Sequence, residues 1–169
     1  MQIRKIDDGQ IRMQISEKIL RQLPDYFGIE ESTLDYIHQS EYQTMFAAYE
    51  DEQPIGFLAL QPHGDACMEV YAMGVLERGH RKGIGRSLME YAFAYAKQQG
   101  CTYVSVKTLG SSHPDEGYRK TRQFYYAMGF QPLEESTQLW GMDCPCLFMI
   151  KHLYMDAPIK NYDLEKPQG

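Results

Sequence analysis

The sequence predicts an α+β domain, a mixed α/β sheet with helices packed on it, and three observations support this fold class. Short apolar runs typical of strands gather in the middle and near the end of the chain. Apolar residues at helical spacing mark further segments before, between and after those runs. The strands and helices do not alternate regularly, so a doubly wound parallel sheet is not predicted.

Length and composition fit one globular domain. The chain has 169 residues, of which 43% are hydrophobic and 24% charged. A chain of this length can bury a sizeable core, and no linker rich in Gly, Ser or Pro divides it. We expect residues 1–153 to form a single domain and residues 154–169, which are polar with two prolines, to form a C-terminal extension or tail.

The first forty residues predict one strand and two helices. Residues 3–6 have the pattern of a short strand. Residues 32–35, Ser-Thr-Leu-Asp, resemble a capping box that opens a helix through about Ser40. Before them, apolar residues recur at helical spacing until Pro24, which predicts an amphipathic helix; they are Ile11, Ile15, Ile19 and Leu23.

The middle of the chain predicts three strands and the longest helix. Residues 45–49 and 55–60 flank a polar turn and predict an antiparallel hairpin. Residues 68–76 are apolar on both faces, as a central strand would be. A helix over residues 83–99 has a clear apolar stripe, and Gly100 occupies the position of a left-handed C-terminal cap.

The last third predicts a strand, a helix and two closing strands. Residues 103–106 form the strand, and a loop follows it. Residues 119–128 predict a helix that ends at Gly129. Strands near residues 130–133 and 147–150 complete the expected fold.

Charge and hydropathy exclude several classes of protein. The net charge of −6 argues against a nucleic-acid partner, because phosphate binding needs a basic face. No apolar run is long enough for a membrane span, so no membrane partner is expected. The first twelve residues are charged and lack the apolar stretch of a secretory signal, which favours a cytoplasmic protein.

The four cysteines predict neither a disulfide framework nor a metal site. They are scattered, and they are too few to staple a chain of this size. The Cys144-Pro-Cys146 pair has one residue between its sulfurs and no second Cys or His pair, which differs from known zinc patterns. We therefore expect reduced, mostly buried thiols and no bound metal.

A basic, glycine-containing loop is the strongest candidate for a binding site. Residues 80–87, His-Arg-Lys-Gly-Ile-Gly-Arg-Ser, lie between the predicted central strand and the long helix. Free N–H groups and the dipole at a helix start attract anions, and glycines let a phosphate approach the backbone. The alternative is an ordinary turn with solvated basic residues; strand, loop and helix together favour a phosphate site.

Two segments resemble signatures of the GNAT superfamily of N-acetyltransferases. Residues 74–89 are similar to its acetyl-CoA-binding motif, and residues 121–130 are similar to a second signature, a helix ending in Tyr-x-x-x-Gly-Phe. The chain departs at His80, where the family usually has Arg or Gln, and at Tyr118, where many members have a cofactor-contacting Asn. The resemblance implies one GNAT-like domain over residues 1–153, with a central, mostly antiparallel, splayed sheet flanked by helices.

The resemblance implies how acetyl-CoA would bind. The pantetheine arm would pair with the backbone of the central strand, where an N–H near Met73 would polarise the thioester carbonyl. The pyrophosphate would lie on N–H groups of the basic loop. The expected cofactor-binding residues are Met73, Gly74, Val75, Arg81, Lys82, Gly83, Ile84, Gly85, Arg86 and Ser87.

The resemblance also implies two catalytic candidates. Glu69 stands where some relatives carry a catalytic Glu, which would act as the base that deprotonates the attacking amine. The alternative for the residue is an ordinary charged side chain at a strand end, and the alternative for the base is a water chain. Tyr125 matches the Tyr of the second signature and would protonate the departing thiolate, with a packing role as the alternative. Tyr126 faces about 100° away on the same helix and is the weaker candidate.

The implied function is acetyl-CoA-dependent transfer of an acetyl group to a primary amine of a small molecule or peptide, by direct attack in a ternary complex. A non-catalytic acetyl-CoA-binding sensor or interaction module is the alternative, and a nucleotide-phosphate binder is a third reading. The acceptor is not specified by the sequence. Aromatic residues in the C-terminal strands are compatible with a homodimer.

Overall fold

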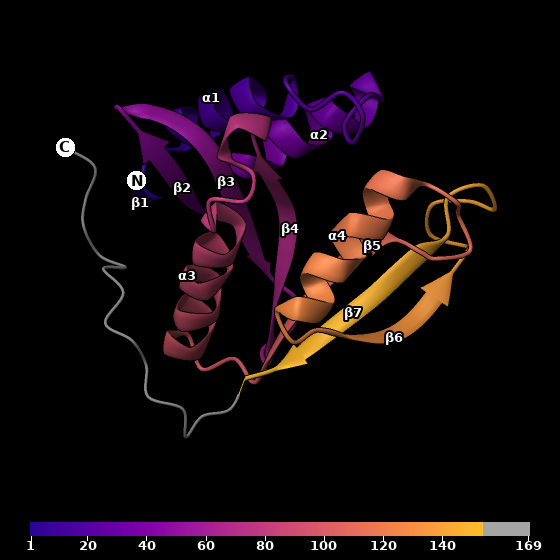
Figure 1. Cartoon of the computed structure of the whole chain (residues 1–169). Helices are drawn as coiled ribbons and strands as arrows, with labels where there is room; N and C mark the ends of the chain where they lie inside the picture. Colours follow the sequence, from indigo (N-terminus) through magenta and orange to yellow (C-terminus); the bar gives the residue numbers. More distant parts are fainter. Residues whose placement is uncertain (154–169) are drawn as a thin grey trace. The chain divides into compact units, whose positions relative to one another are not determined.

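The computed structural model describes residues 1–153 of the chain (Figure 1). The predicted tail, residues 154–169, lies outside the described residues. No helix within residues 1–153 is long and apolar enough to cross a membrane. The elements are, in order, β1 (Gln2–Ile6), α1 (Gly9–Leu20), α2 (Glu30–Ser40), β2 (Thr44–Glu50), β3 (Gln53–Pro62), β4 (Cys67–Val75), a short 3₁₀ turn (Glu77–Gly79), α3 (Ile84–Gln98), β5 (Tyr103–Leu109), α4 (Glu116–Ala127), β6 (Gln131–Ser136) and β7 (Cys146–His152).

The strands form one seven-stranded mixed sheet, which confirms the predicted α+β class. Their order is β1-β2-β3-β4-β5-β7-β6. The described registers are antiparallel for β1–β2, β2–β3, β5–β7 and β6–β7, and parallel for β4–β5. The described β4–β5 pairs run from Cys67 to Val70, although β4 continues to Val75.

The described chain divides into two compact units. The first contains residues 1–61 and 71–95, and the second contains residues 62–70 and 96–153. Strand β4 contributes its beginning to the second unit and its end to the first. That residues 1–153 act as a single domain stays a prediction.

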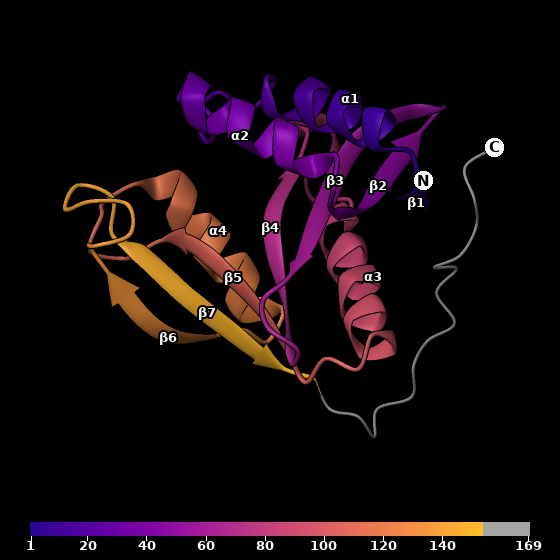
Figure 2. The ribbon, with the colours of Figure 1, turned by 180° about the vertical axis from the view of Figure 1, so that it is seen from behind.

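In the first unit, helices pack on both faces of the strands. Helices α1 and α2 lie side by side in Figures 1 and 2. On the opposite face of β2, Phe46 contacts the rings of Tyr91 and Tyr95 from α3. The core against α1 and α2 consists of Ile6, Ile15, Ile19, Leu20, Ile37, Met45, Ala47, Phe57, Ala59, Ala72 and Leu76. The helical periodicity predicted for residues 11–23 is confirmed in part: Ile15 and Ile19 are in the core, Ile11 is 39% exposed, and α1 ends at Leu20.

The capping box predicted at residues 32–35 is wrong. Helix α2 begins at Glu30, and its N-cap residue, Ile29, makes no side-chain cap. Glu30 and Glu31 place negative charge in the first turn, which the helix dipole favours without a cap. The cap that sequence reasoning missed belongs to α1, where the Asp8 side chain accepts hydrogen bonds from the N–H groups of Gln10 and Ile11.

The second unit packs α4 on one face of its strands. Figure 1 shows α4 in front of β5 and β7, and Figure 2 shows the same strands from the other side. Because strand residues alternate, Val104 and Val106 lie on one face, while Ser105 and Lys107 lie on the other. The buried Arg122 of α4 donates a hydrogen bond to the Leu109 carbonyl at 2.7 Å and so ties the helix to β5.

Candidate active site

The loop before α3 has the geometry of an anion site. The N–H of Ser87 donates to the Gly83 carbonyl at 3.0 Å. The N–H groups of residues 84–86 belong to the first turn of the helix, which has no earlier carbonyl to bond. Gly83 has φ +76°, and a Cβ built there would meet no atom within 4 Å. The first turn of α3 therefore presents backbone donors next to open space.

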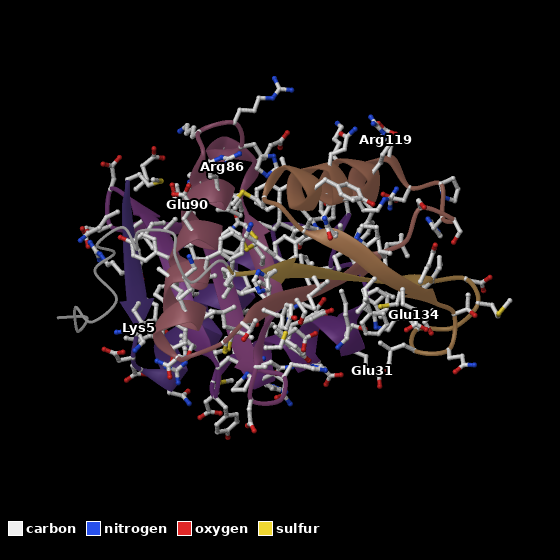
Figure 3. The ribbon with its side chains drawn as sticks, turned by 90° about the horizontal axis from the view of Figure 1, so that it is seen from below. Lys5, Glu31, Arg86, Glu90, Arg119 and Glu134 are labelled. Atoms are coloured by element: carbon white, nitrogen blue, oxygen red, sulfur yellow. The ribbon has the colours of Figure 1, made fainter. Side chains whose placement is uncertain are left out.

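Exposed cations surround these donors. Arg81, Lys82 and Arg86 are all solvent-exposed. Figure 3 shows Arg86 on α3 with Glu90 one turn further along the helix. The ammonium of Lys82 lies 3.3 Å from a carboxylate oxygen of Glu50, a surface pair of small energetic value that leaves the charge available. Positive side chains and the helix dipole thus act at the same place.

Apolar side chains pack closely around the glycines that precede the loop. A Cβ on Gly79 would lie 2.9 Å from Ile84 Cδ1 and 3.0 Å from Val75 Cγ1, so a side chain at this position would require these two side chains to shift. A Cβ on Gly74 would lie 3.0 Å from Leu23 and 3.1 Å from Ile19. Val75 and Ile84 therefore use their side chains for packing, and only their backbone atoms are left for a ligand.

His80 joins the loop to the end of β4. Its Nε2 lies 2.8 Å from the Val75 carbonyl oxygen. A carbonyl only accepts hydrogen bonds, so Nε2 is the donor in this contact. The residue that departs from the expected motif thus has a local structural role.

Arg81 has a backbone conformation that sequence reasoning missed. Its φ is +61°, in the left-handed region that glycine adopts without cost. We expect Arg81→Gly to raise the free energy of unfolding by about 1 kcal/mol and to weaken CoA binding, because it relieves strain while removing a cation. Thermal unfolding and calorimetric titration with CoA measure the two effects separately. Gains in both stability and affinity would contradict a phosphate role for this side chain.

Glu69 is a buried carboxylate with two basic neighbours in the second unit. It is 3% exposed and lies on β4. Its Oε1 accepts a hydrogen bond from Lys107 Nζ at 2.8 Å, and its Oε2 lies 3.7 Å from His63 Nδ1. Sequence reasoning missed both partners, because Lys107 lies on the strand face of Ser105 and reaches Glu69 only through the pairing of β4 with β5.

The thiols near this group are poor nucleophiles. Burial raises the pKa of Cys146 to about 11; nearby Glu69 also raises it, and Lys107 opposes the shift. Burial also raises the pKa of Cys67, against a hydrogen bond with Ser105. Both thiols are protonated at neutral pH, so neither supplies a thiolate. Within residues 1–153, no group of three or more His, Cys, Asp or Glu side chains is placed to hold a metal ion.

The sequence matches one protein family over most of its length. The family described as "Acetyltransferase (GNAT) family" matches residues 13–130, which include the basic loop and the helix with the second signature. The chain belongs to the GNAT family of acetyltransferases. It is thereby an acyltransferase of the GNAT type, as the two sequence signatures predict. No curated protein matches the chain.

Solved GNAT structures share the fold. A protein assigned to the GNAT family from Desulfovibrio desulfuricans has a TM-score of 0.76 at 14% identity, over 90% of this chain and 99% of its own. The aminoglycoside 6'-N-acetyltransferase from Enterococcus faecium has a TM-score of 0.70 at 20% identity, over 91% and 98%. A GNAT acetyltransferase from Elizabethkingia anophelis with acetyl-CoA bound has a TM-score of 0.69 at 17% identity, over 90% and 97%.

Tyr125 lies on the buried face of α4 in this GNAT-family chain. It is 7% exposed, and its ring contacts Phe130 and Phe124, each at 5.6 Å between centroids. Tyr126 is 48% exposed, so the two neighbouring tyrosines face different surroundings as predicted. The ring contacts fix the direction in which the Tyr125 hydroxyl points.

Proposed function

We propose that the protein transfers the acetyl group of acetyl-CoA to a primary amine of a small molecule or peptide, by direct attack in a ternary complex. The observation that carries this proposal is the loop before α3. Its backbone donors, its open space at Gly83 and its exposed cations suit a pyrophosphate, which has charge and acceptor oxygens but little apolar surface.

We propose that acetyl-CoA binds the residues predicted from the sequence, and that these residues contact different parts of the cofactor. Arg81, Lys82 and Arg86 would supply charge, and the backbone N–H groups of residues 83–86 together with the Ser87 hydroxyl would supply donors to the phosphates. The strand backbone at residues 73–75 would hold the pantetheine arm. Acetyl-CoA supplies the thioester that is to be cleaved, and a GNAT neighbour of the same fold binds it.

Glu69 is the proposed base. Most alkylamines are protonated at neutral pH and have no lone pair with which to attack. A buried carboxylate that is oriented by its ion pair with Lys107 can take this proton. Glu69 would therefore receive the ammonium proton of the acceptor, either directly or through one water molecule.

Tyr125 is the proposed acid, and its removal is testable. We expect Tyr125→Phe to lower kcat by about 100-fold while leaving CoA affinity nearly unchanged, because the ring packing stays and only the proton donor is lost. Steady-state kinetics and CoA titration measure the two quantities. Tyr126→Phe is the matched control on the same helix, and it should leave kcat unchanged. Equal kcat in the Tyr125→Phe variant would leave Tyr125 a packing residue.

The first experiment is thiol release from acetyl-CoA with a panel of primary amines, while thermal shift follows CoA binding. The panel includes alkylamines, polyamines, peptides with free N-termini and an aminoglycoside, because one structural neighbour is named for aminoglycoside acetylation. Turnover with any amine supports the proposal and names the acceptor class. Stabilisation by CoA without turnover on a broad panel favours the non-catalytic sensor, and no effect of CoA contradicts both.

Two further expectations belong to this proposal. We propose that the protein acts in the cytoplasm, where acetyl-CoA is available. The oligomeric state, monomer or homodimer, is to be measured by size-exclusion chromatography with light scattering.

A further inference from the structure

The environment of Glu69 raises a problem for the proposed base. Its carboxylate is almost entirely buried, so a proton taken from the acceptor does not pass directly to bulk water. A base that stays protonated is lost for the next turnover. The charged and titratable groups around Glu69 must therefore include one that accepts this proton and also meets solvent.

Lys107 does not meet this requirement. Its ammonium donates to Oε1 of Glu69 at 2.8 Å and lies 5.7 Å from the centre of the Phe148 ring. An ammonium carries only donors, so it has no lone pair for a further proton. What Lys107 does is occupy one carboxylate oxygen and fix the orientation of the other.

The two nearby thiols do not meet it either. Cys67 and Cys146 both interact electrostatically with Glu69, and burial raises the pKa of each. They are already protonated at neutral pH, and they are neither exposed nor basic. His63 differs from Lys107 and from these two thiols, because it combines a basic nitrogen with solvent exposure.

His63 connects the second oxygen of Glu69 with water. Its Nδ1 lies 3.7 Å from Oε2, while its side chain is 62% exposed. The backbone N–H of His63 donates to the Cys67 carbonyl at 2.8 Å, which fixes the turn that carries the ring. Contacts of this length in a free enzyme commonly shorten, or are bridged by one water, in the reacting complex.

We propose that His63 passes the proton from Glu69 to solvent and that Lys107 is the positioning residue that holds Glu69 for this transfer. The inference rests on the proposed function, with Glu69 as the base. The acceptor ammonium loses one N–H proton to Oε2 of Glu69 before it attacks, and the second N–H proton, lost as the amide forms, replaces the proton that Tyr125 gives to the CoA thiolate. The relay uses the imidazole with its proton on Nε2: the proton from Glu69 moves to Nδ1, and the proton on Nε2 leaves to water. The carboxylate and the neutral imidazole are restored, and Lys107 keeps its charge throughout.

The test compares His63→Ala with the wild type, using acetyl-CoA and the best amine of the panel. We expect kcat to fall by about tenfold or more while both KM values stay unchanged, since His63 acts on proton transfer and not on binding. Added imidazole should restore much of the lost rate, because it replaces the missing base. His152→Ala removes another exposed histidine of the second unit and should leave kcat unchanged.

Two results would overturn the relay. One is an unchanged kcat in His63→Ala. The other is a lower kcat that imidazole does not restore, which would leave His63 a structural residue of its turn. His63→Gln keeps a polar side chain there and repeats the test if the alanine variant melts at lower temperature. A wild-type enzyme without turnover on any amine would instead contradict the proposed function, before any variant is compared.

The positioning role of Lys107 is tested by the kcat of two further variants. We expect Lys107→Met to lower kcat without raising the KM for acetyl-CoA, and we expect Lys107→Arg to recover most of the rate because the guanidinium also pairs with a carboxylate. Equal losses in the methionine and arginine variants would contradict the positioning role.

Discussion

Replacing Glu69 with glutamine is expected to lower kcat by about 10²- to 10⁴-fold, the range for loss of a positioned general base. Glutamine has nearly the same shape as glutamate, but its amide takes up no proton at neutral pH. The Michaelis constant for acetyl-CoA should change little, because the proposed phosphate site is formed by other residues. Steady-state kinetics at saturating acetyl-CoA measure the effect. The control is Glu134→Gln, an exposed carboxylate of β6 in the same unit (Figure 3).

The same substitution should also destabilise the fold, and this effect must be separated from catalysis. Glu69→Gln leaves the ammonium of Lys107 without its counter-charge in a partly buried place, at a cost of roughly 1–3 kcal/mol. The double variant Glu69→Gln with Lys107→Met should recover stability but not turnover. A double variant that recovers both would show that Glu69 is structural. Full turnover in Glu69→Gln alone would leave a water chain as the route for the proton.

The fold class could be predicted because it depends on patterns along the chain. Apolar spacing located α1, α3 and the β2–β3 hairpin, since the residues that create the pattern also form the core. Helix ends were harder to predict. The Ser and Asp at residues 32–35 satisfied a capping pattern, yet α2 begins at Glu30 because first-turn charge can replace a side-chain cap.

The candidate site also has a part that could be predicted from the sequence and a part that could not. The basic loop is one contiguous segment, so its glycines and cations could be found in the sequence. The partners of Glu69 could not be found in the sequence. Lys107 lies 38 residues away on β5, and it meets Glu69 only because β4 and β5 pair in parallel with Glu69 opposite Ser105. Gly74 has a packing role that the motif did not reveal: it was predicted as a ligand contact, and a Cβ there would also lie 3.0 Å from Leu23 and 3.1 Å from Ile19, so these side chains favour glycine.

Gly83→Glu is expected to abolish CoA binding while leaving the protein folded. A side chain at this position meets no atom within 4 Å, so its cost in the free protein is confined to the left-handed backbone, about 1 kcal/mol. A carboxylate at a helix N-terminus is favoured by the dipole and partly offsets this cost. The same carboxylate would occupy the open space and repel the phosphates.

We therefore expect at least about a 100-fold loss of CoA affinity by calorimetry, with little change in melting temperature in the absence of CoA. Gly100→Glu is the matched control at the other end of α3. Gly100 has φ +82°, and a Cβ there also meets no atom within 4 Å, so the variant has the same strain and charge away from the loop. It should bind CoA like the wild type. Unchanged affinity in Gly83→Glu would mean that the phosphates bind elsewhere, whereas equal losses in both variants would attribute the effect to net charge.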